Sequence, residues 1–278
     1  MRLSATELDC PALVRHVHAS GVVVYRSALL DRVGFRHGFS TRHGGVSAAP
    51  FDTLNLGVAQ TPGEPDSDAN IARNAALLME AIEATECEMV RVRQVHGCGV
   101  RMAERDDRFG PPSAEADAIV SVHPTVAPCI RTADCVPVLL ACTATGAVAS
   151  VHAGWRSIVA GVVGETIRAM ATRGVHAQDL AVAIGPGIGC GAFEVGEEVA
   201  QAFGVAGLDD HVVRSPEWPK PHVDCAAAVR AQLLACGVQP NRIEGGGLCT
   251  VRMAREFFSY RRDGARSGRM GAVIVPRY

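Results

Sequence analysis

The apolar positions of the chain are most concentrated between Val136 and His152, where two apolar runs flank a short turn at Thr143–Gly146. Apolar runs of this length that are bounded by turn residues are typical of buried strands. The pattern therefore predicts an antiparallel hairpin in the middle of the chain.

The register of this hairpin brings a cysteine and a histidine together. With Ala144 and Thr145 in the turn, antiparallel pairing places His152 opposite Pro137 and places Cys135 two residues further along on the same face. A thiol and an imidazole on one face of a rigid hairpin form half of a zinc site. The question for the remaining chain is whether it supplies a third ligand.

Elsewhere the apolar positions alternate between the strand period and the helix period. They predict strands at Val22–Ala28, Val90–Val95, Ala116–Ser121, Ala127–Arg131, Asp179–Ile184 and Ala272–Val275. They predict helices at Ala69–Ala84, Ile158–Thr172 with Ser157 as N-cap, Val195–Phe203 begun by Glu194, Asp224–Cys236 and Val251–Glu256. Many short strands with scattered single helices indicate a mixed fold with helices packed outside the sheets.

His96 is the best candidate for the third ligand. It ends the predicted strand Val90–Val95 and is followed by Gly97, which leaves room for a ligand near the backbone. The other candidates are histidines in predicted loops without a matching cysteine: His123, His176, His211 and His222. Three protein ligands leave a fourth position open, as catalytic zinc sites do.

Composition and charge exclude several classes of protein. The net charge of −2, with both signs interspersed, lacks the broad basic field that a nucleic-acid polymer requires. The longest apolar runs are far shorter than the roughly 20 residues that span a bilayer, so we expect no membrane segment. The acidic residues near the N-terminus are unlike a signal peptide, which predicts a cytoplasmic protein. Ten cysteines without a CxxC pair are typical of reduced thiols.

Three arginine-containing segments could hold an anion. Arg42 follows Ser40 in a glycine-containing loop, Arg156 precedes a predicted helix start, and Arg262 lies beside a tyrosine and an aspartate. Guanidinium groups and free backbone amides bind phosphate and carboxylate groups well. A solvent-exposed arginine in an ordinary turn is the alternative interpretation of each segment.

Several motifs together resemble one family. In chain order they are GFSTRHGGVS, LNLG, QVHG, ADAIVS, TADCVPVLL, VHAGWR, IGPGIG with FEVGEEV, and FFSYRRDG with SGR. This order is similar to that of the polyphenol-oxidase or laccase-domain family, which is also described as multifunctional purine nucleoside phosphorylases and as bacterial peptidoglycan editing factors. The resemblance covers about residue 38 to the C-terminus.

The resemblance implies an α+β fold with mixed β-sheets in a single domain over residues 1–278. It implies His96, Cys135 and His152 as metal ligands, with zinc favoured over the copper of the family's older name. It also implies that Arg42 and Arg262, with Ser40 beside Arg42, form part of the substrate or phosphate pocket.

The activity that the resemblance implies is phosphorolysis of purine nucleosides, including methylthioadenosine, together with deamination of adenosine. The partners would be purine nucleosides and phosphate, and the protein would be a monomer or a weak homo-oligomer. Asp134 and Glu194 are candidate proton shuttles, although Asp134 should point away from Cys135 and could instead organise the surroundings of the metal. Three alternatives stay open: a zinc amidase-type enzyme that edits peptidoglycan precursors, a copper-dependent polyphenol oxidase, and a metal-binding scaffold without turnover.

Overall fold

Two six-stranded mixed sheets form the centre of the protein in the computed structural model, which describes residues 13–57, 65–112 and 114–277. The first sheet contains, in spatial order, β1 (Val14–Val17), β2 (Val23–Arg26), β3 (His37–Ser40), β14 (Met270–Ile274), β7 (Val126–Thr132) and β4 (Glu88–Val90). The second contains β13 (Ile243–Gly245), β10 (Leu180–Ile184), β8 (Val136–Cys142), β9 (Val148–Ala153), β6 (Ala118–Ser121) and β5 (Val100–Met102). The expected α+β fold with mixed sheets is confirmed.

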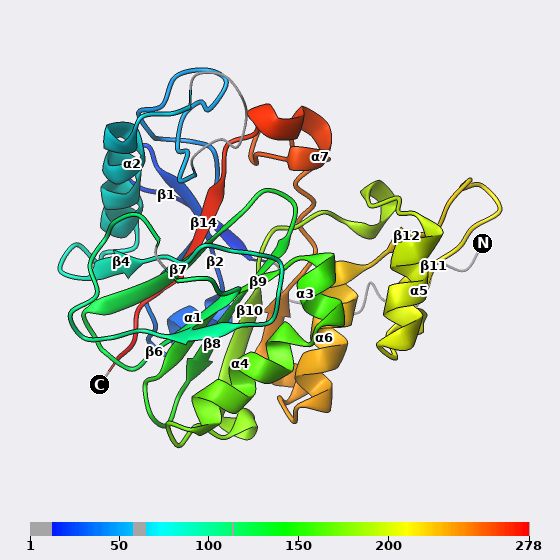
Figure 1. The fold of residues 1–278 in the computed structure, drawn as a ribbon. Coiled ribbons are helices and arrows are strands. Elements are labelled where there is room, and N and C mark those ends of the chain that lie inside the picture. The colour runs from blue at the N-terminus through cyan, green and yellow to red at the C-terminus, as the bar shows by residue number, and fades with distance from the viewer. Residues whose placement is uncertain (1–12, 58–64, 113, 278) are drawn as a thin grey trace.

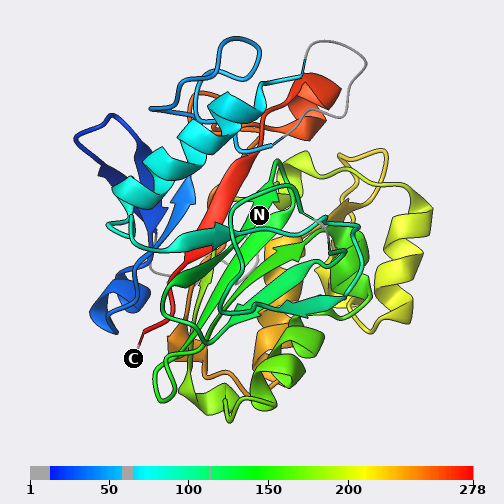
Figure 2. The ribbon, with the colours of Figure 1, turned by 60° about the vertical axis from the view of Figure 1, so that its left-hand side comes forward.

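Helices cover the outer faces of the two sheets (Figure 1). The helices are α1 (Ala28–Arg32), α2 (Asp68–Ala81), α3 (Trp155–Val159), α4 (Val162–Ala171), α5 (Glu197–Val205), α6 (Cys225–Ala235) and α7 (Tyr260–Asp263). The strands β11 (Val212–Val213) and β12 (His222–Val223) form a separate small antiparallel pair. Figure 2 shows α2 in cyan on one side of the red β14, with the green and yellow elements on the other side.

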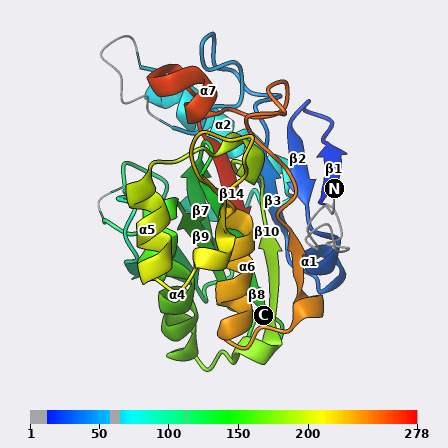
Figure 3. The same cartoon turned by 90° about the vertical axis from the view of Figure 1, so that its right-hand side faces the viewer.

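Alternating side chains of the central strands build the layers. Val138 and Leu140 of β8 pack with the core under α4, α5 and α6, whereas Leu139 and Ala141 pack against residues of the first sheet such as Ile130. Because both faces of β8 are buried, its sequence is a continuous apolar run. The order of layers is therefore α2, first sheet, second sheet and the helices α3 to α6. Figure 3 shows α4 and α5 on one side of the molecule and β1, β2 and β3 of the first sheet on the other.

The register of the central hairpin is the predicted one. Pro137 pairs with His152 and Ala141 pairs with Val148, so that the turn falls on residues 143–146. The predicted helices at Ala69–Ala84 and Asp224–Cys236 correspond to α2 and α6, whose first turns are capped by the side chains of Ser67 and Asp224.

The predicted helix Ile158–Thr172 with Ser157 as its N-cap is wrong in its start and in its continuity. The chain forms α3 from Trp155 to Val159, is interrupted at Gly161, and resumes as α4. Gly161 has φ +79°, a left-handed conformation that ends one helix before the next begins. Ser157 lies inside α3 and is buried.

One predicted strand and one predicted helix also differ from the structure. Of the predicted strand Val90–Val95 only Val90 lies in a strand, β4. Arg93 forms an isolated bridge with Glu115, and the N–H of Val95 donates to the Asp117 carboxylate. The predicted helix Val195–Phe203 begins instead at Glu197, since Gly196 is its N-cap. Glu194 therefore precedes the helix.

The predicted helix Val251–Glu256 is replaced by turns. Arginine side chains take the carbonyl groups that a helix would use: Arg262 Nη1 donates to Thr250 O at 3.0 Å, and Arg42 Nη1 donates to Ala254 O at 3.2 Å. Across the described residues, none of the helices has the length and apolar character needed to cross a membrane.

Candidate metal centre and substrate cavity

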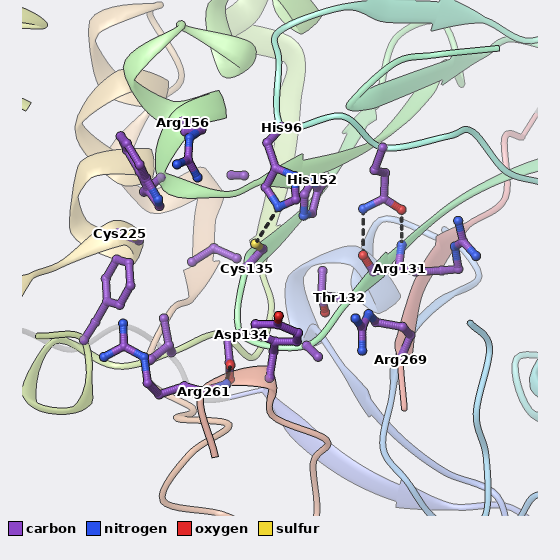
Figure 4. Close-up of a pocket in the computed structure, with 18 of the residues that line it drawn as sticks. His96, Arg131, Thr132, Asp134, Cys135, His152, Arg156, Cys225, Arg261 and Arg269 are labelled. Atoms are coloured by element: carbon purple, nitrogen blue, oxygen red, sulfur yellow. Dashed lines mark hydrogen bonds between the residues drawn. The ribbon is translucent and has the colours of Figure 1, made fainter. Parts of the chain in front are cut away.

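Three potential ligands from separate parts of the chain converge at one end of the second sheet. His96 lies in the segment after β4, Cys135 directly precedes β8, and His152 lies in β9. Their ligand atoms all lie within 4.8 Å of one another, and Cys135 Sγ is 3.9 Å from His96 Nε2 (Figure 4). The hairpin supplies two donors, and a distant segment supplies the third.

The buried carboxylate of Asp117 positions both histidines. Its Oδ1 accepts hydrogen bonds from His152 Nδ1 at 2.8 Å and from the backbone N–H of His96 at 3.0 Å, and its Oδ2 accepts the N–H of Gly97 at 2.6 Å. The bond to His152 fixes the proton on Nδ1, so Nε2 is the nitrogen available to a metal.

The same carboxylate stabilises an unusual backbone conformation at His96. His96 has φ +60°, which costs free energy in a residue with a side chain. Three successive backbone N–H groups, from Val95 to Gly97, converge on Asp117, and this concave arrangement of amides suits an anion. Asp117 thus offsets the strain that directs the His96 side chain toward Cys135.

The charges at the centre favour the thiolate form of Cys135 and the charged form of His152. Burial opposes ionisation of Cys135, but the charge of His152 and hydrogen bonds from both histidines outweigh it and lower the pKa of the thiol. Burial also opposes a charged His152, but the Cys135 thiolate and the Asp117 carboxylate raise the pKa of that imidazole. Cys135 is therefore available as a thiolate ligand near neutral pH.

The donor set fits zinc and leaves space beside it. Two imidazole nitrogens and one thiolate are ligands that zinc prefers, and three protein ligands leave one position open. Gly154 keeps the space between the ligands free, because a Cβ there would lie 2.9 Å from His96 Cδ2 and 3.1 Å from Cys135 Sγ.

A cavity of about 460 Å³ opens onto the three side chains, a size typical of small-molecule sites. Five arginines contribute to its lining: Arg93, Arg131, Arg156, Arg261 and Arg269. Aromatic and aliphatic side chains also contribute, namely Trp155, Ile188, Phe193 and Tyr260. The cavity is therefore cationic, although the whole chain carries a net charge of −2.

Asp134 lies in the lining, but its carboxylate is fully engaged with the protein. One oxygen accepts from Thr250 Oγ1 and the other from the N–H of Arg261, both at 2.6 Å. Its carbonyl accepts the N–H of Ile188 at 2.7 Å. These bonds connect the glycine-rich loop of residues 185–191, the turns before α7 and α7 itself at one corner of the cavity. The geometry therefore favours the organising role among the two roles that the sequence suggests for Asp134.

The other residues singled out in the sequence lie in different surroundings. Arg156 lines the cavity, whereas Ser40, Arg42, Arg262 and Glu194 are not among the lining residues. The buried Ser40 accepts the N–H of Gly271 at 2.9 Å. Arg42 bonds to the carbonyl of Asp52 at 3.0 Å.

Arg262 and Glu194 also have partners outside the cavity. Arg262 Nη2 donates to Phe257 O at 2.9 Å and forms an ion pair with Asp263 at 2.7 Å. Glu194 forms an ion pair with Lys220 at 3.3 Å. These side chains hold loops together around the cavity and do not reach into it.

Sequence reasoning missed Asp117, Arg131 and Arg269. Asp117 is a single acidic residue before an apolar strand, a signal that becomes informative only when β6 is known to lie beside β9. Arg131 and Arg269 are brought together by the pairing of β7 with β14, which no local pattern predicts.

Comparisons with known proteins show the family and the fold. The model of the family described as multi-copper polyphenol oxidoreductase laccase matches residues 36–277. A protein of Deinococcus radiodurans named purine nucleoside phosphorylase is 39% identical over 243 residues, which cover 87% of this chain and 89% of that protein. A protein of Bacteroides thetaiotaomicron with the same name is 37% identical over 250 residues, covering 86% of this chain and 90% of that protein.

A solved structure extends the likeness over nearly the whole chain. The crystal structure of YlmD from Geobacillus stearothermophilus has a TM-score of 0.82 and 28% sequence identity, and the match covers 96% of this chain and 100% of that one.

Proposed function

The chain belongs to the multi-copper polyphenol oxidoreductase laccase family, and on this premise we propose that it is a zinc-dependent purine nucleoside phosphorylase. The observation that carries the proposal is the convergence of His96, Cys135 and His152 at an arginine-rich cavity of about 460 Å³. The names of the relatives from Deinococcus radiodurans and Bacteroides thetaiotaomicron support the same activity. Its substrates would be purine nucleosides and inorganic phosphate.

The donor set supports zinc over copper oxidase chemistry. Within the described residues, His96, Cys135 and His152 form the one cluster of this kind, whereas a multicopper oxidase needs several histidine-rich clusters. A bound zinc ion would supply Lewis acidity and lower the pKa of water in its open position.

The residues of the chain suit the charges of phosphorolysis. In that reaction a phosphate oxygen forms a bond to C1′ of the ribose, the C1′–N9 bond breaks, and the purine leaves with the electron pair and takes up a proton. Arginines that line the cavity would hold the phosphate dianion and reduce its repulsion from the leaving base. The apolar walls would exclude bulk water from the reacting carbon.

The same centre supports two finer activities as part of the proposal. Methylthioadenosine differs from adenosine only at the 5′ position, so its phosphorolysis uses the same contacts. Deamination of adenosine adds water at C6 and releases ammonia, and the space kept free by Gly154 gives that water access to the centre.

The test is an assay of the purified, metal-analysed protein with adenosine and phosphate. We expect adenine and ribose 1-phosphate, with inosine formed also when phosphate is omitted. The variant Cys135→Ala should lose both activities and most of its zinc, whereas Cys142→Ala in the buried core should keep both. Absence of ribose 1-phosphate, free base and inosine from the wild type would overturn the proposal.

Two parallel assays address the competing functions. Release of amino acid from a serine-containing peptidoglycan precursor, without nucleoside turnover, would favour an editing amidase. Copper at stoichiometric levels with oxidation of a phenol would favour a polyphenol oxidase.

A further inference from the structure

The cavity has two chemically different ends with the metal ligands between them. In Figure 4, Arg156 and Cys225 lie on one side of the three ligands, and Arg131, Thr132 and Arg269 lie on the other. The first side is aromatic, because Trp155 packs on Arg156 with 4.2 Å between the ring centroid and the guanidinium carbon. On the second side the Tyr260 ring lies 5.7 Å from the guanidinium carbon of Arg269, and this side differs from the first in the hydrogen-bond donors that it leaves free.

Arg269 has donors available at the second end. Its Nη1 donates to Ser267 O at 2.6 Å and to Gly268 O at 3.0 Å, which fixes the guanidinium in place. Nε and Nη2 have no hydrogen-bond partner among the described residues, and no described carboxylate forms an ion pair with this arginine. Its aliphatic stem packs where a Cβ at Gly57 would lie, 2.4 Å from Cγ.

Thr132 adds a neutral donor to the same end. It lies at the end of β7, directly opposite Met270, the residue after Arg269. Thr132 lines the cavity, and its hydroxyl has no hydrogen-bond partner among the described residues. A fixed guanidinium edge and a free hydroxyl are groups that bind the oxygens of a tetrahedral anion.

Further positive charge lies behind this end. The Nε atoms of Arg91 and Arg131 are buried without a hydrogen-bond partner among the described residues. Burial, and after it the neighbouring charge of Arg91, lower the pKa of Arg131 to about 10. No described carboxylate forms an ion pair with either arginine, so a bound anion would compensate charge that the protein leaves unpaired.

We propose that Arg269 and Thr132, supported by the charge of Arg131, form the phosphate subsite, and that the end formed by Trp155 and Phe193 receives the purine ring. The assignment rests on the proposed function and follows the geometry of substitution at C1′. The incoming oxygen and the departing N9 lie on opposite sides of that carbon, so phosphate and base belong at opposite ends of the cavity.

The aromatic end has the surfaces that a purine needs. The Phe193 ring lies 5.2 Å from the guanidinium carbon of Arg261, and Ile188 adds an aliphatic surface to the same lining. Flat bases stack on aromatic rings and on guanidinium planes with little dependence on the identity of the base. This end therefore suits several purines, and the end that contains Arg269 and Thr132 suits the shared phosphate.

The experiment separates the two ends in the zinc-loaded full-length protein. Binding of inorganic phosphate alone is measured by calorimetry, and KM is measured separately for phosphate and for inosine. Arg269→Gln should weaken phosphate binding and raise its KM by about 10- to 100-fold, as expected for loss of a charged hydrogen-bonding partner. The KM for inosine should change by less than about threefold. Arg269→Lys, which keeps the charge but not the planar fork, should lie between wild type and Arg269→Gln.

Three further variants make the assignment specific. Thr132→Val should raise the KM for phosphate by about threefold to tenfold, consistent with the loss of one neutral hydrogen bond. Phe193→Leu should raise the KM for inosine and leave phosphate binding unchanged. The surface variant Arg173→Gln removes the same charge far from the lining residues and should match the wild type. Circular dichroism and zinc content establish that each variant is folded.

The outcomes distinguish this assignment from the proposed function. If the wild type performs phosphorolysis and Arg269→Gln and Thr132→Val keep the wild-type KM for phosphate, the subsite is wrong and the function stands. If the wild type binds phosphate through Arg269 but cleaves no nucleoside, the function is wrong and the anion subsite stands. If phosphate does not bind and no nucleoside is cleaved, both are overturned.

Discussion

At the scale of single residues, Asp117 determines how well the centre holds a metal. Replacing it with asparagine places an amide NH₂ against N–H groups that now donate to the carboxylate, and it removes the charge beside His152. We expect Asp117→Asn to weaken zinc binding by about 10- to 100-fold, measured by competition with a chromophoric chelator. Asparagine has nearly the same shape as aspartate, so we expect the variant to lose only about 1–3 kcal/mol of folding stability.

A matched control distinguishes this positioning role from general destabilisation. Asp66 is also buried and also accepts several hydrogen bonds, including those from Ser47 and Asn55. Asp66→Asn should lose comparable stability and keep the wild-type affinity for zinc. Equal losses of zinc affinity in the two variants would assign Asp117 a purely structural role.

His37 predicts a pH dependence of stability that is independent of the metal centre. It is fully buried, its Nε2 accepts the N–H of Ser27 at 2.8 Å, and Nδ1 donates to Phe35 O at 2.8 Å. Burial lowers its pKa from 6.5 to about 4, so below pH 6.5 the unfolded chain binds a proton that the folded protein excludes. Stability is therefore fully present above pH 6.5 and decreases as the pH falls to 4, by up to about 3 kcal/mol.

The measurement is urea unfolding of chelator-treated protein at several pH values. His37→Gln, which cannot titrate, should differ from the wild type by an amount that becomes smaller as the pH falls from 6.5 to 4. His16→Gln, which removes an imidazole from an exposed position, is measured alongside as the matched control. A constant difference between wild type and His37→Gln across this range would contradict the assignment.

At the scale of elements, the glycines at the ends of β9 and α3 have separate functions. Gly154 lies among the ligands, whereas a Cβ at Gly161 would contact nothing within 4 Å but would occupy a backbone with φ +79°. We expect Gly154→Ala to reduce zinc affinity by at least about tenfold through displacement of ligand side chains. Gly161→Ala should lower stability by about 1 kcal/mol and leave zinc affinity unchanged. Chelator competition measures the zinc affinity of both variants, and thermal unfolding measures their stability. A similar loss of zinc affinity in Gly154→Ala and Gly161→Ala would contradict this prediction.

The elements also explain how far the sequence predicts the fold and the centre. The hairpin register follows from local information, because the number of residues in the turn determines which residues pair, and Cys135 and His152 follow from it. The interruption at Gly161 was not predictable, since an isolated glycine inside an apolar helical pattern is compatible with a continuous helix. The position of Arg269 depends on the pairing of β14 with β7, a contact between distant segments.

At the scale of the whole molecule, the centre lies where the chain passes from one sheet to the other. The segment Ala133–Cys135 connects β7 of the first sheet to β8 of the second. The first sheet positions Thr132, at the end of β7, and Arg269, directly before β14. The second sheet positions Cys135, directly before β8, and His152 in β9. The cavity can therefore combine a cationic wall and a metal centre, because each is built on a different rigid layer.

A bound metal should also stabilise this junction as a whole. It would connect the segment containing His96 to the central hairpin, and a ligand that binds only the folded protein adds about 2.7 kcal/mol at 100 times its dissociation constant. Chelator treatment should lower the melting temperature by roughly 5–10 °C, and added zinc should restore it. Cys135→Ala should lose this response because a ligand is missing, whereas Cys142→Ala, in the buried core, should melt earlier than the wild type and still gain stability from zinc. Scanning calorimetry with elemental analysis provides the measurement, and a wild type that binds zinc without any gain in melting temperature would show that the ion does not connect these segments.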